Sequence, residues 1–169
     1  RWAAAEGRCT LDAAGRPIRF PGVSFDVTER KRTEAALRES EDRLRGITDT
    51  VEQMIWSTRA DGFHDYYNAR WYEYTGVPAG STDGEAWNGM FHPEDQERAW
   101  EVWRRCLATG ETYRIEYRLR HRSGRYRWVL GLAKPLHDGT GRIRRWFGTC
   151  TDIHDRKMAE ERQAFLLAL

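Results

Sequence analysis

The sequence predicts an α+β domain in which a five-stranded antiparallel sheet carries its helices on one face, with linker helices before and after it. Three observations support this class: two aromatic-rich runs precede a helical middle, an alternating pattern begins after Thr112, and short turns join the strand-like segments there. Two strands, short helices, one longer helix and three further strands form a single sheet with helices collected on one side.

The first elements lie within QMIWSTRADGFHDYYN and ARWYEYTG. The pair Asp61-Gly62 separates two strand-like runs, which is typical of a tight turn between antiparallel strands. Asn68 is suited to cap the N-terminus of a short helix, and Gly76 is suited to end it. These residues predict a hairpin followed by a short helix.

The second half changes from a helical pattern to an alternating one. Pro93 suits the first turn of a longer helix, and Gly110 its end. The apolar side chains that then alternate with charged ones, and that we expect to face the core, are Tyr113, Ile115, Tyr117 and Leu119. We expect an outer stripe of arginines formed by Arg114, Arg118, Arg120, Arg122, Arg125 and Arg127. Turns at Ser123-Gly124 and from Asp138 to Gly141 separate the last three strands.

The segment from Trp2 to Glu34 recurs without a gap at a constant offset of 126 positions, so that Asp26 stands where Asp152 stands later. An offset of this size is a reasonable length for one domain plus a connector. We therefore expect an excised part of a longer protein. Residues 1–28 would be the last strands of a truncated preceding domain, 29–50 a linker helix, 51–153 a complete domain, and 154–169 the start of an output helix.

The linker segment ERKRTEAALRESEDRLRGITDTV is rich in helix formers. Its apolar residues near heptad positions are Leu37, Leu44, Ile47, Val51 and Met54. This narrow stripe predicts either a parallel dimeric coiled coil, which would make the protein a homodimer, or a solvated single helix.

Several phrases in this order resemble the PAS domains of bacterial sensor proteins, of the type whose exit segment is called the PAC motif. They are ESEDRLR, DGFHDYYNARWYEYTG, FHPED, EYRLRHRSGRYRWV and GRIRRWFGTCTDIHDRK, and the resemblance covers nearly all of 39–155. The fragment from Trp2 to Thr28 resembles the last strands of another such domain. The resemblance implies a PAS sheet that hands over to an output helix after each copy of the repeated phrase.

In this family an Asp-aliphatic-Thr triplet joins the last strand to the following helix, and the resemblance implies a signal-transfer role for it. The first copy matches with Asp26 and Thr28, whereas the second reads Asp152 and His154. The alternative is that each aspartate only caps a helix. The histidine suggests a pH-sensitive joint, although a solvated linker histidine is the commoner case.

Bulky residues assigned to the inner face could line a cavity for a small organic ligand, or could fill the core completely. They are Ile55, Tyr67, Trp71, Trp87, Met90, Trp100, Trp103, Tyr117, Trp128 and Phe147. The flavin-binding phrase Asn-Cys-Arg-Phe-Leu-Gln does not occur, and 95–109 contains no histidine for a haem. Flavin and haem are therefore disfavoured, and no cofactor is predicted.

The composition narrows the function classes. A balance of 28 basic and 26 acidic residues favours no nucleic-acid partner, and no stretch is apolar enough to contact a membrane as a span. Three widely spaced cysteines fit free thiols in the cytoplasm. The histidines are scattered, so neither a metal site nor a catalytic residue is predicted.

We therefore expect a sensory or relay PAS domain that is not itself an enzyme. The parent would be a sensor histidine kinase of a two-component phosphorelay, with its catalytic or other effector domains outside this chain. The alternatives are a constitutive dimerisation spacer without a ligand, and the input domain of a diguanylate cyclase.

Overall fold

A computed structural model describes residues 1–19 and 21–168, so Phe20 of the repeat and Leu169 of the expected output helix lie outside the described residues. The chain divides into two compact units, Arg1–Gly46 and Ile47–Leu169. Helix α1 spans Thr28–Thr50. Among the described residues, no helix is both long and apolar enough to cross a membrane.

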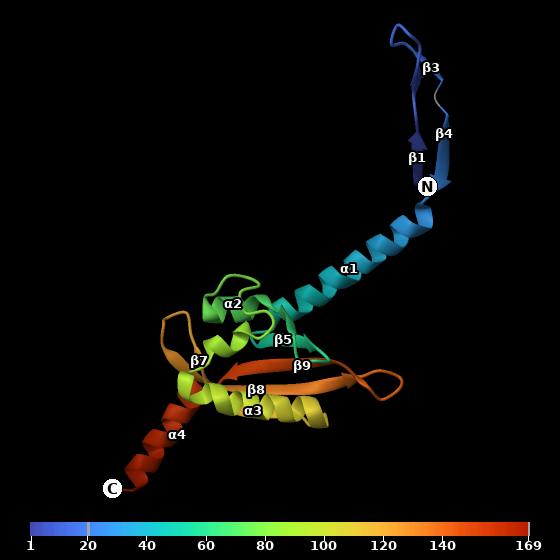
Figure 1. Ribbon diagram of the computed structural model, residues 1–169. Helices are drawn as coiled ribbons and strands as arrows, with labels where there is room; N and C mark the ends of the chain where they lie inside the picture. The colour runs from blue at the N-terminus through green and yellow to red at the C-terminus, as the bar shows by residue number, and fades with distance from the viewer. Residues whose placement is uncertain (20, 169) are drawn as a thin grey trace. The chain divides into compact units, whose positions relative to one another are not determined.

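The second unit contains one antiparallel five-stranded sheet in the order β6-β5-β9-β8-β7. Its strands are β5 (Met54–Arg59), β6 (His64–Tyr67), β7 (Tyr113–Arg120), β8 (Tyr126–His137) and β9 (Ile143–Asp152). The last strand, β9, lies between β5 and β8, so the exit from the domain starts at the centre of the sheet (Figure 1). The five-stranded sheet expected from the sequence is confirmed.

The helices of this unit are α2 (Ala69–Thr75), the 3-10 helix η1 (Ala86–Met90), α3 (Pro93–Thr109) and α4 (His154–Leu167). As predicted, Asn68 caps α2 through its side chain, and Gly76 ends that helix with a φ of 73°. Pro93 opens α3, and Gly110 ends it with a φ of 74°.

Helices α2, η1 and α3 all pack on the same face of the sheet. Trp71 of α2 stacks on Tyr67 with ring centroids 4.6 Å apart. Trp103 of α3 meets Trp146 edge-on at 5.2 Å. Because the sheet residues in these contacts point to one side, the buried core lies between the sheet and these helices.

The alternation on β7 is confirmed, because Tyr113, Ile115, Tyr117 and Leu119 are all buried. On the neighbouring strands the predicted face was wrong for three residues. Ile55, Trp128 and Phe147 point to the opposite face of the sheet, and their neighbours Trp56, Val129 and Trp146 are buried instead. Each error is a slip of one position where two bulky residues are adjacent, and one position reverses the face in a strand.

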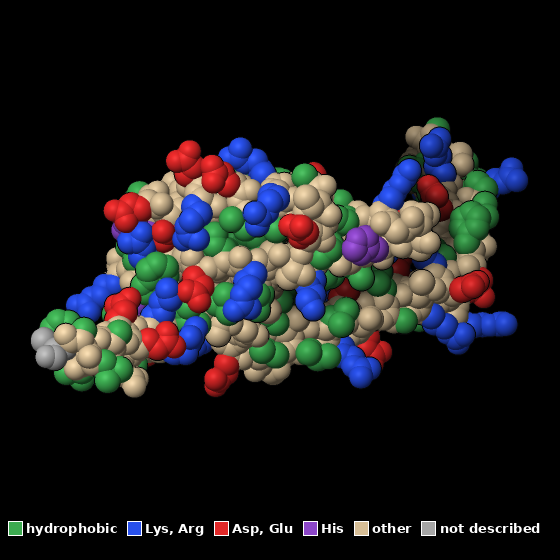
Figure 2. All heavy atoms as spheres, turned by 90° about the horizontal axis from the view of Figure 1, so that it is seen from below, with side chains coloured by type: hydrophobic (Ala, Val, Ile, Leu, Met, Phe, Trp, Pro, Cys, Tyr) green, Lys and Arg blue, Asp and Glu red, His purple; other side chains and the backbone are tan. Residues whose placement is uncertain are grey.

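Arg127 also differs from the expected outer stripe. It pairs across the ladder with Leu119, which is fully buried on the helix side of the sheet. On the surface shown in Figure 2, basic and acidic side chains are interspersed among apolar ones rather than separated into large patches of one sign.

The first unit contains two strand pairs: β1 (Ala3–Gly7) with β4 (Gly22–Asp26), and β2 (Thr10–Leu11) with β3 (Pro17–Arg19). None of its described side chains is buried, and Trp2 is 64% exposed. The assignment of these strands to a truncated preceding domain stays a prediction.

Candidate functional site

The junction between β9 and α4 is organised by the carboxylate of Asp152. Its Oδ2 accepts hydrogen bonds from the Tyr74 hydroxyl at 2.7 Å and from Nε of Arg127 at 2.6 Å. Its Oδ1 accepts the backbone N–H of His154 at 2.8 Å. One carboxylate thus joins α2, β8 and the first residue of α4.

The electrostatics of this junction favour the charged carboxylate. Burial by itself opposes ionisation of Asp152, but the bonds from Arg127, Tyr74 and the His154 amide outweigh it and lower the pKa of Asp152. The Arg127 guanidinium also reaches Asp155 in the first turn of α4 at 3.1 Å. The arginine therefore connects β8 to the output helix as well as to the strand before it.

His154 occupies the third position of the exit triplet. Its Nδ1 accepts the backbone N–H of Trp128 at 3.4 Å, and the N–H of Ile153 is donated to the carbonyl of Trp128 at 2.9 Å. An accepting Nδ1 requires that the neutral ring carry its proton on Nε2. The imidazole thus stands in for the hydroxyl that a threonine would offer at this position.

Lys157 holds α4 to the other face of the sheet. Its Nζ lies 2.8 Å from a carboxylate oxygen of Glu116 on β7 and 4.1 Å from the ring centre of Trp128 on β8. The hydrogen bond from Lys157 lowers the pKa of Glu116. The first turn of α4 therefore contacts residues on both faces of the sheet, at the end of the central strand β9.

The first copy of the triplet, in the other unit, has the same backbone arrangement. The Asp26 carboxylate accepts the N–H of Thr28 at 2.9 Å, and the Thr28 hydroxyl accepts the N–H of Trp2 at 2.8 Å. The N–H of Val27 is donated to the carbonyl of Trp2 at 3.0 Å. These bonds match those of the second copy residue for residue at the offset of 126.

The sequence analysis assigned Arg127 to the outer arginine stripe and not to the exit junction, although the repeat contained a signal for the second role. Arg1 stands 126 positions before Arg127, so the repeat begins one residue earlier than Trp2. Arg1 lines a surface groove together with Asp26 and Thr28. Tyr74 was also missed, and no local signal pointed to it, because it lies 78 positions before Asp152.

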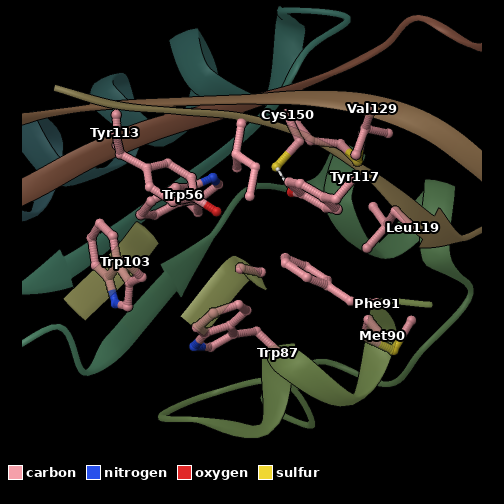
Figure 3. Close-up of a cluster of buried hydrophobic side chains, with 14 of the residues drawn as sticks. Trp56, Trp87, Met90, Phe91, Trp103, Tyr113, Tyr117, Leu119, Val129 and Cys150 are labelled. Atoms are coloured by element: carbon pink, nitrogen blue, oxygen red, sulfur yellow. Dashed lines mark hydrogen bonds between the residues drawn. The ribbon is translucent and has the colours of Figure 1, made fainter. Parts of the chain in front are cut away.

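The aromatic core contains a cavity of about 20 Å³. Figure 3 shows several of the side chains that line it, among them Trp56, Trp87 and Tyr117. Its lining comprises Trp56, His64, Tyr67, Trp71, Trp87, Phe91, Trp103, Tyr113, Tyr117 and Cys150. Five of the predicted cavity residues are in this set: Tyr67, Trp71, Trp87, Trp103 and Tyr117. Met90 is buried in the same cluster, and Trp100 packs on Trp87 with ring centroids 5.0 Å apart. A volume of this size holds about one water molecule.

Two polar side chains in the cavity wall were not anticipated. Burial lowers the pKa of His64 to about 3, so its ring is neutral at physiological pH, and its Nδ1 lies 3.2 Å from the carbonyl of Gly62. The thiol of Cys150 lies 3.0 Å from the Tyr117 hydroxyl, and burial raises the pKa of Cys150 to about 11. Trp87 Nε1 is buried without a hydrogen-bond partner among the described residues.

Among residues 1–19 and 21–168, no three His, Cys, Asp or Glu side chains are grouped so that they could hold a metal ion. The arrangement of the exit junction offers hydrogen bonds and ion pairs between elements rather than reacting groups.

Comparisons with known proteins agree with this architecture. The family described as PAS fold matches residues 64–150. An uncharacterized protein of Sinorhizobium fredii is 33% identical over 147 residues, which are 87% of this chain and 18% of that protein. The peroxide stress-activated histidine kinase mak1 of Schizosaccharomyces pombe is 28% identical over 89% of this chain and 10% of its own length. The chain therefore spans less than a fifth of these two relatives.

A solved structure gives a similar match. The N-terminal domain of a diguanylate cyclase with a PAS/PAC sensor from Marinobacter aquaeolei superposes with a TM-score of 0.57 at 25% identity. The match covers 62% of this chain and 98% of that domain.

Proposed function

Because this chain belongs to the PAS family and is a sensory domain of signal transduction, we propose that it relays a conformational change to helix α4 within a longer bacterial signalling protein. The observation that carries this proposal is the Asp152 carboxylate, which binds Tyr74 of α2, Arg127 of β8 and the first amide of α4 at once. A displacement of the helix or of the sheet changes the position of the same carboxylate.

The relay needs two arrangements of the exit junction that differ little in free energy. In the arrangement seen here, α4 is held through Asp152, Asp155 and Lys157. Movement of β8 or β9 along the sheet would alter these contacts and release or rotate the first turn of α4. The output is then a change in the pairing or rotation of the helices that leave the domain.

The size of the core cavity supports a relay over a receptor for a large cofactor. A cavity of about 20 Å³ is too small for a flavin or a haem. A small organic ligand could enter only if the aromatic side chains that line the cavity moved apart. We propose that no flavin or haem binds here and that the signal arrives through the flanking segments. A ligand of a few atoms between Trp56, Trp87 and Tyr117 is the alternative for the core.

We propose a cytoplasmic sensor histidine kinase as the parent, with kinase or other effector domains beyond this fragment, since mak1 is a histidine kinase. A homodimer joined by α1 and α4 would pass the helix movement to those domains. A diguanylate cyclase is the second candidate, because the matched domain from Marinobacter belongs to one. A constitutive dimerisation spacer would keep the same contacts but would not respond to a signal.

Replacing Asp152 by alanine in the parent tests the relay against the capping role. We expect the variant to lose the dependence of effector turnover on signal while the free energy of unfolding falls by about 1–2 kcal/mol. Asp138→Ala is the matched control, because Asp138 Oδ1 accepts the N–H of Thr140 in an exposed turn away from α4. Loss of signal response only in proportion to lost stability, as in the control, would make Asp152 merely a cap.

Native mass spectrometry of this chain, repeated after denaturation, tests ligand and oligomer together. We expect a dimer with no additional mass. Additional mass that is lost on unfolding would contradict the proposal that the core holds no ligand, and a monomer at micromolar concentration would contradict dimerisation through the helices.

A further inference from the structure

Resting on the proposed relay, we infer that Tyr74 is a positioning residue that couples α2 to the exit junction. Its hydroxyl donates to Oδ2 of Asp152 at 2.7 Å. This bond directly links a helix of the core to the carboxylate that holds the start of α4. The two residues belong to elements that are far apart in the chain, so the bond forms only in the folded domain.

The last turn of α2 is fixed on three sides around Tyr74. The ring packs edge-on against His121, with centroids 4.8 Å apart at an angle of 76°. The carbonyl of Tyr74 accepts the N–H of Arg122 at 2.8 Å. The hydroxyl is held by Asp152. Burial raises the pKa of Tyr74 above its usual value, so the hydroxyl stays protonated and can donate at physiological pH.

The same helix reaches the core cavity one turn earlier. Trp71 is 2% exposed and lines the cavity, and its Nε1 donates to the Thr82 hydroxyl at 3.0 Å. Residues three positions apart lie on one side of a helix, so a shift of Trp71 carries Tyr74 with it. Helix α2 thus touches the cavity through Trp71 and the exit junction through Tyr74.

An open groove borders the bond between Tyr74 and Asp152. Both residues line it, together with His121 and Arg127. Water can therefore reach the carboxylate when the hydroxyl is removed, so the loss of the bond should cost little global stability. A residue placed in this way is expected to affect coupling more than folding.

The test is Tyr74→Phe in this chain, with Tyr72→Phe as the matched control. Tyr72 lies on the same helix, and its hydroxyl accepts the N–H of Gly80, away from the junction. Hydrogen exchange is measured at the amides of His154 and Lys157, which bond to Asp152 and to the Ile153 carbonyl. We expect Tyr74→Phe to accelerate exchange at these two amides about tenfold relative to strand β9, and Tyr72→Phe to leave them unchanged.

A second measurement follows the transmission itself. Trp71→Phe perturbs the cavity end of α2, and the resulting change in the amide chemical shift of His154 is recorded. We expect this change to be at least halved when Tyr74→Phe is also present, and to persist with Tyr72→Phe. If Trp71→Phe does not fold, the exchange comparison alone decides.

The inference is overturned if Tyr74→Phe and Tyr72→Phe give the same exchange at His154 and Lys157, or if Tyr74→Phe accelerates exchange uniformly across the domain. Exchange at Lys157 in Asp152→Ala distinguishes a failure of the inference about Tyr74 from a failure of the proposed relay. If Asp152→Ala accelerates exchange at Lys157 and also shifts the amide signals of α2, whereas Tyr74→Phe leaves Lys157 unchanged, the relay stands without Tyr74. If Asp152→Ala has no effect at Lys157, the relay itself fails.

Discussion

The two exit junctions share one backbone arrangement but differ in what surrounds it. Asp26 and Asp152 each accept the N–H of the residue two positions later, and Thr28 and His154 each accept the N–H of a tryptophan. Asp152 also binds a tyrosine and an arginine from a packed domain. The triplet is therefore enough to form the turn, whereas coupling to a core requires the additional partners that the second unit supplies.

The largest difference in stability loss between equivalent substitutions in the two copies is expected at the glycine four positions before each aspartate. A Cβ at Gly148 would lie 2.3 Å from the Trp56 ring, whereas one at Gly22 would lie 3.2 Å from a backbone oxygen of Glu6 in an exposed hairpin. Gly148→Ala should lower the free energy of unfolding by about 3 kcal/mol or more, and Gly22→Ala by less than about 1 kcal/mol. Urea unfolding followed by tryptophan fluorescence measures both, and equal losses would contradict the packing of Trp56 over Gly148.

The next effect concerns the arginine that opens each repeat. Arg127→Gln removes a donor from Asp152 and the contact with Asp155, and should cost about 1–2 kcal/mol. Arg1→Gln should change the free energy of unfolding by no more than about 0.5 kcal/mol, since the residue is exposed. Thermal unfolding of the two variants checks this. Similar stability in both would show that the ion pair at Asp152 contributes nothing measurable.

Lowering the pH should destabilise the second exit junction more than the first. A carboxylate whose folded-state pKa lies below its unfolded value of about 3.9 stabilises the fold above that pH, and the contribution is lost as the pH falls through the folded-state pKa. The fold lowers the pKa of Asp152. It also lowers the pKa of Asp95 in α3, which lies beside Arg118 of β7. Stability should therefore decrease below about pH 4.

Asp152→Asn isolates the share of the exit junction in this acid dependence. The slope of stability against pH below about pH 4 should become shallower in the variant but not vanish, because Asp95 still titrates. Asp26→Asn should reduce the slope less than Asp152→Asn does, because the bonds from Thr28 lower the pKa of Asp26 in a position where solvent screens the carboxylate. An unaltered slope in Asp152→Asn would show that its carboxylate is not stabilised by the fold.

The smallest effect is expected from exchanging the third residue of the triplet. His154→Thr gives the second junction the residue of the first, and the threonine hydroxyl can accept the N–H of Trp128 as Thr28 accepts that of Trp2. Stability should change by less than about 0.5 kcal/mol, and protection of the Trp128 amide should be kept. Rapid exchange of that amide in the variant would show that the imidazole makes a bond that threonine cannot replace.

The sequence predicted most of the sheet because its local signals were unambiguous. On β7 each apolar residue is flanked by charged ones, so the buried face could be assigned. On β8 and β9 the adjacent pairs Trp128-Val129 and Trp146-Phe147 offer two registers of similar hydrophobicity, and only the pairing with β5 and β7 decides between them.

The exit junction was predicted only in part, because some of its contacts are local in the sequence and others are not. The triplet is local and was found, and Arg127 could have been found by extending the repeat to Arg1. Tyr74 could not, since its contact with Asp152 spans 78 positions and depends on how α2 packs against the sheet. Local hydrogen bonds leave a sequence pattern, whereas contacts made by packing do not.

Hydrogen exchange at Lys31 and Lys157 in Asp26→Ala and Asp152→Ala tests the coupling most directly. The two amides bond to the equivalent carbonyls of Val27 and Ile153. We predict that Asp152→Ala accelerates exchange at Lys157 about tenfold and also shifts the amide signals of α2, whereas Asp26→Ala changes only its own turn. Acceleration at Lys157 with no change in α2 would contradict the account, because both aspartates would then be local caps.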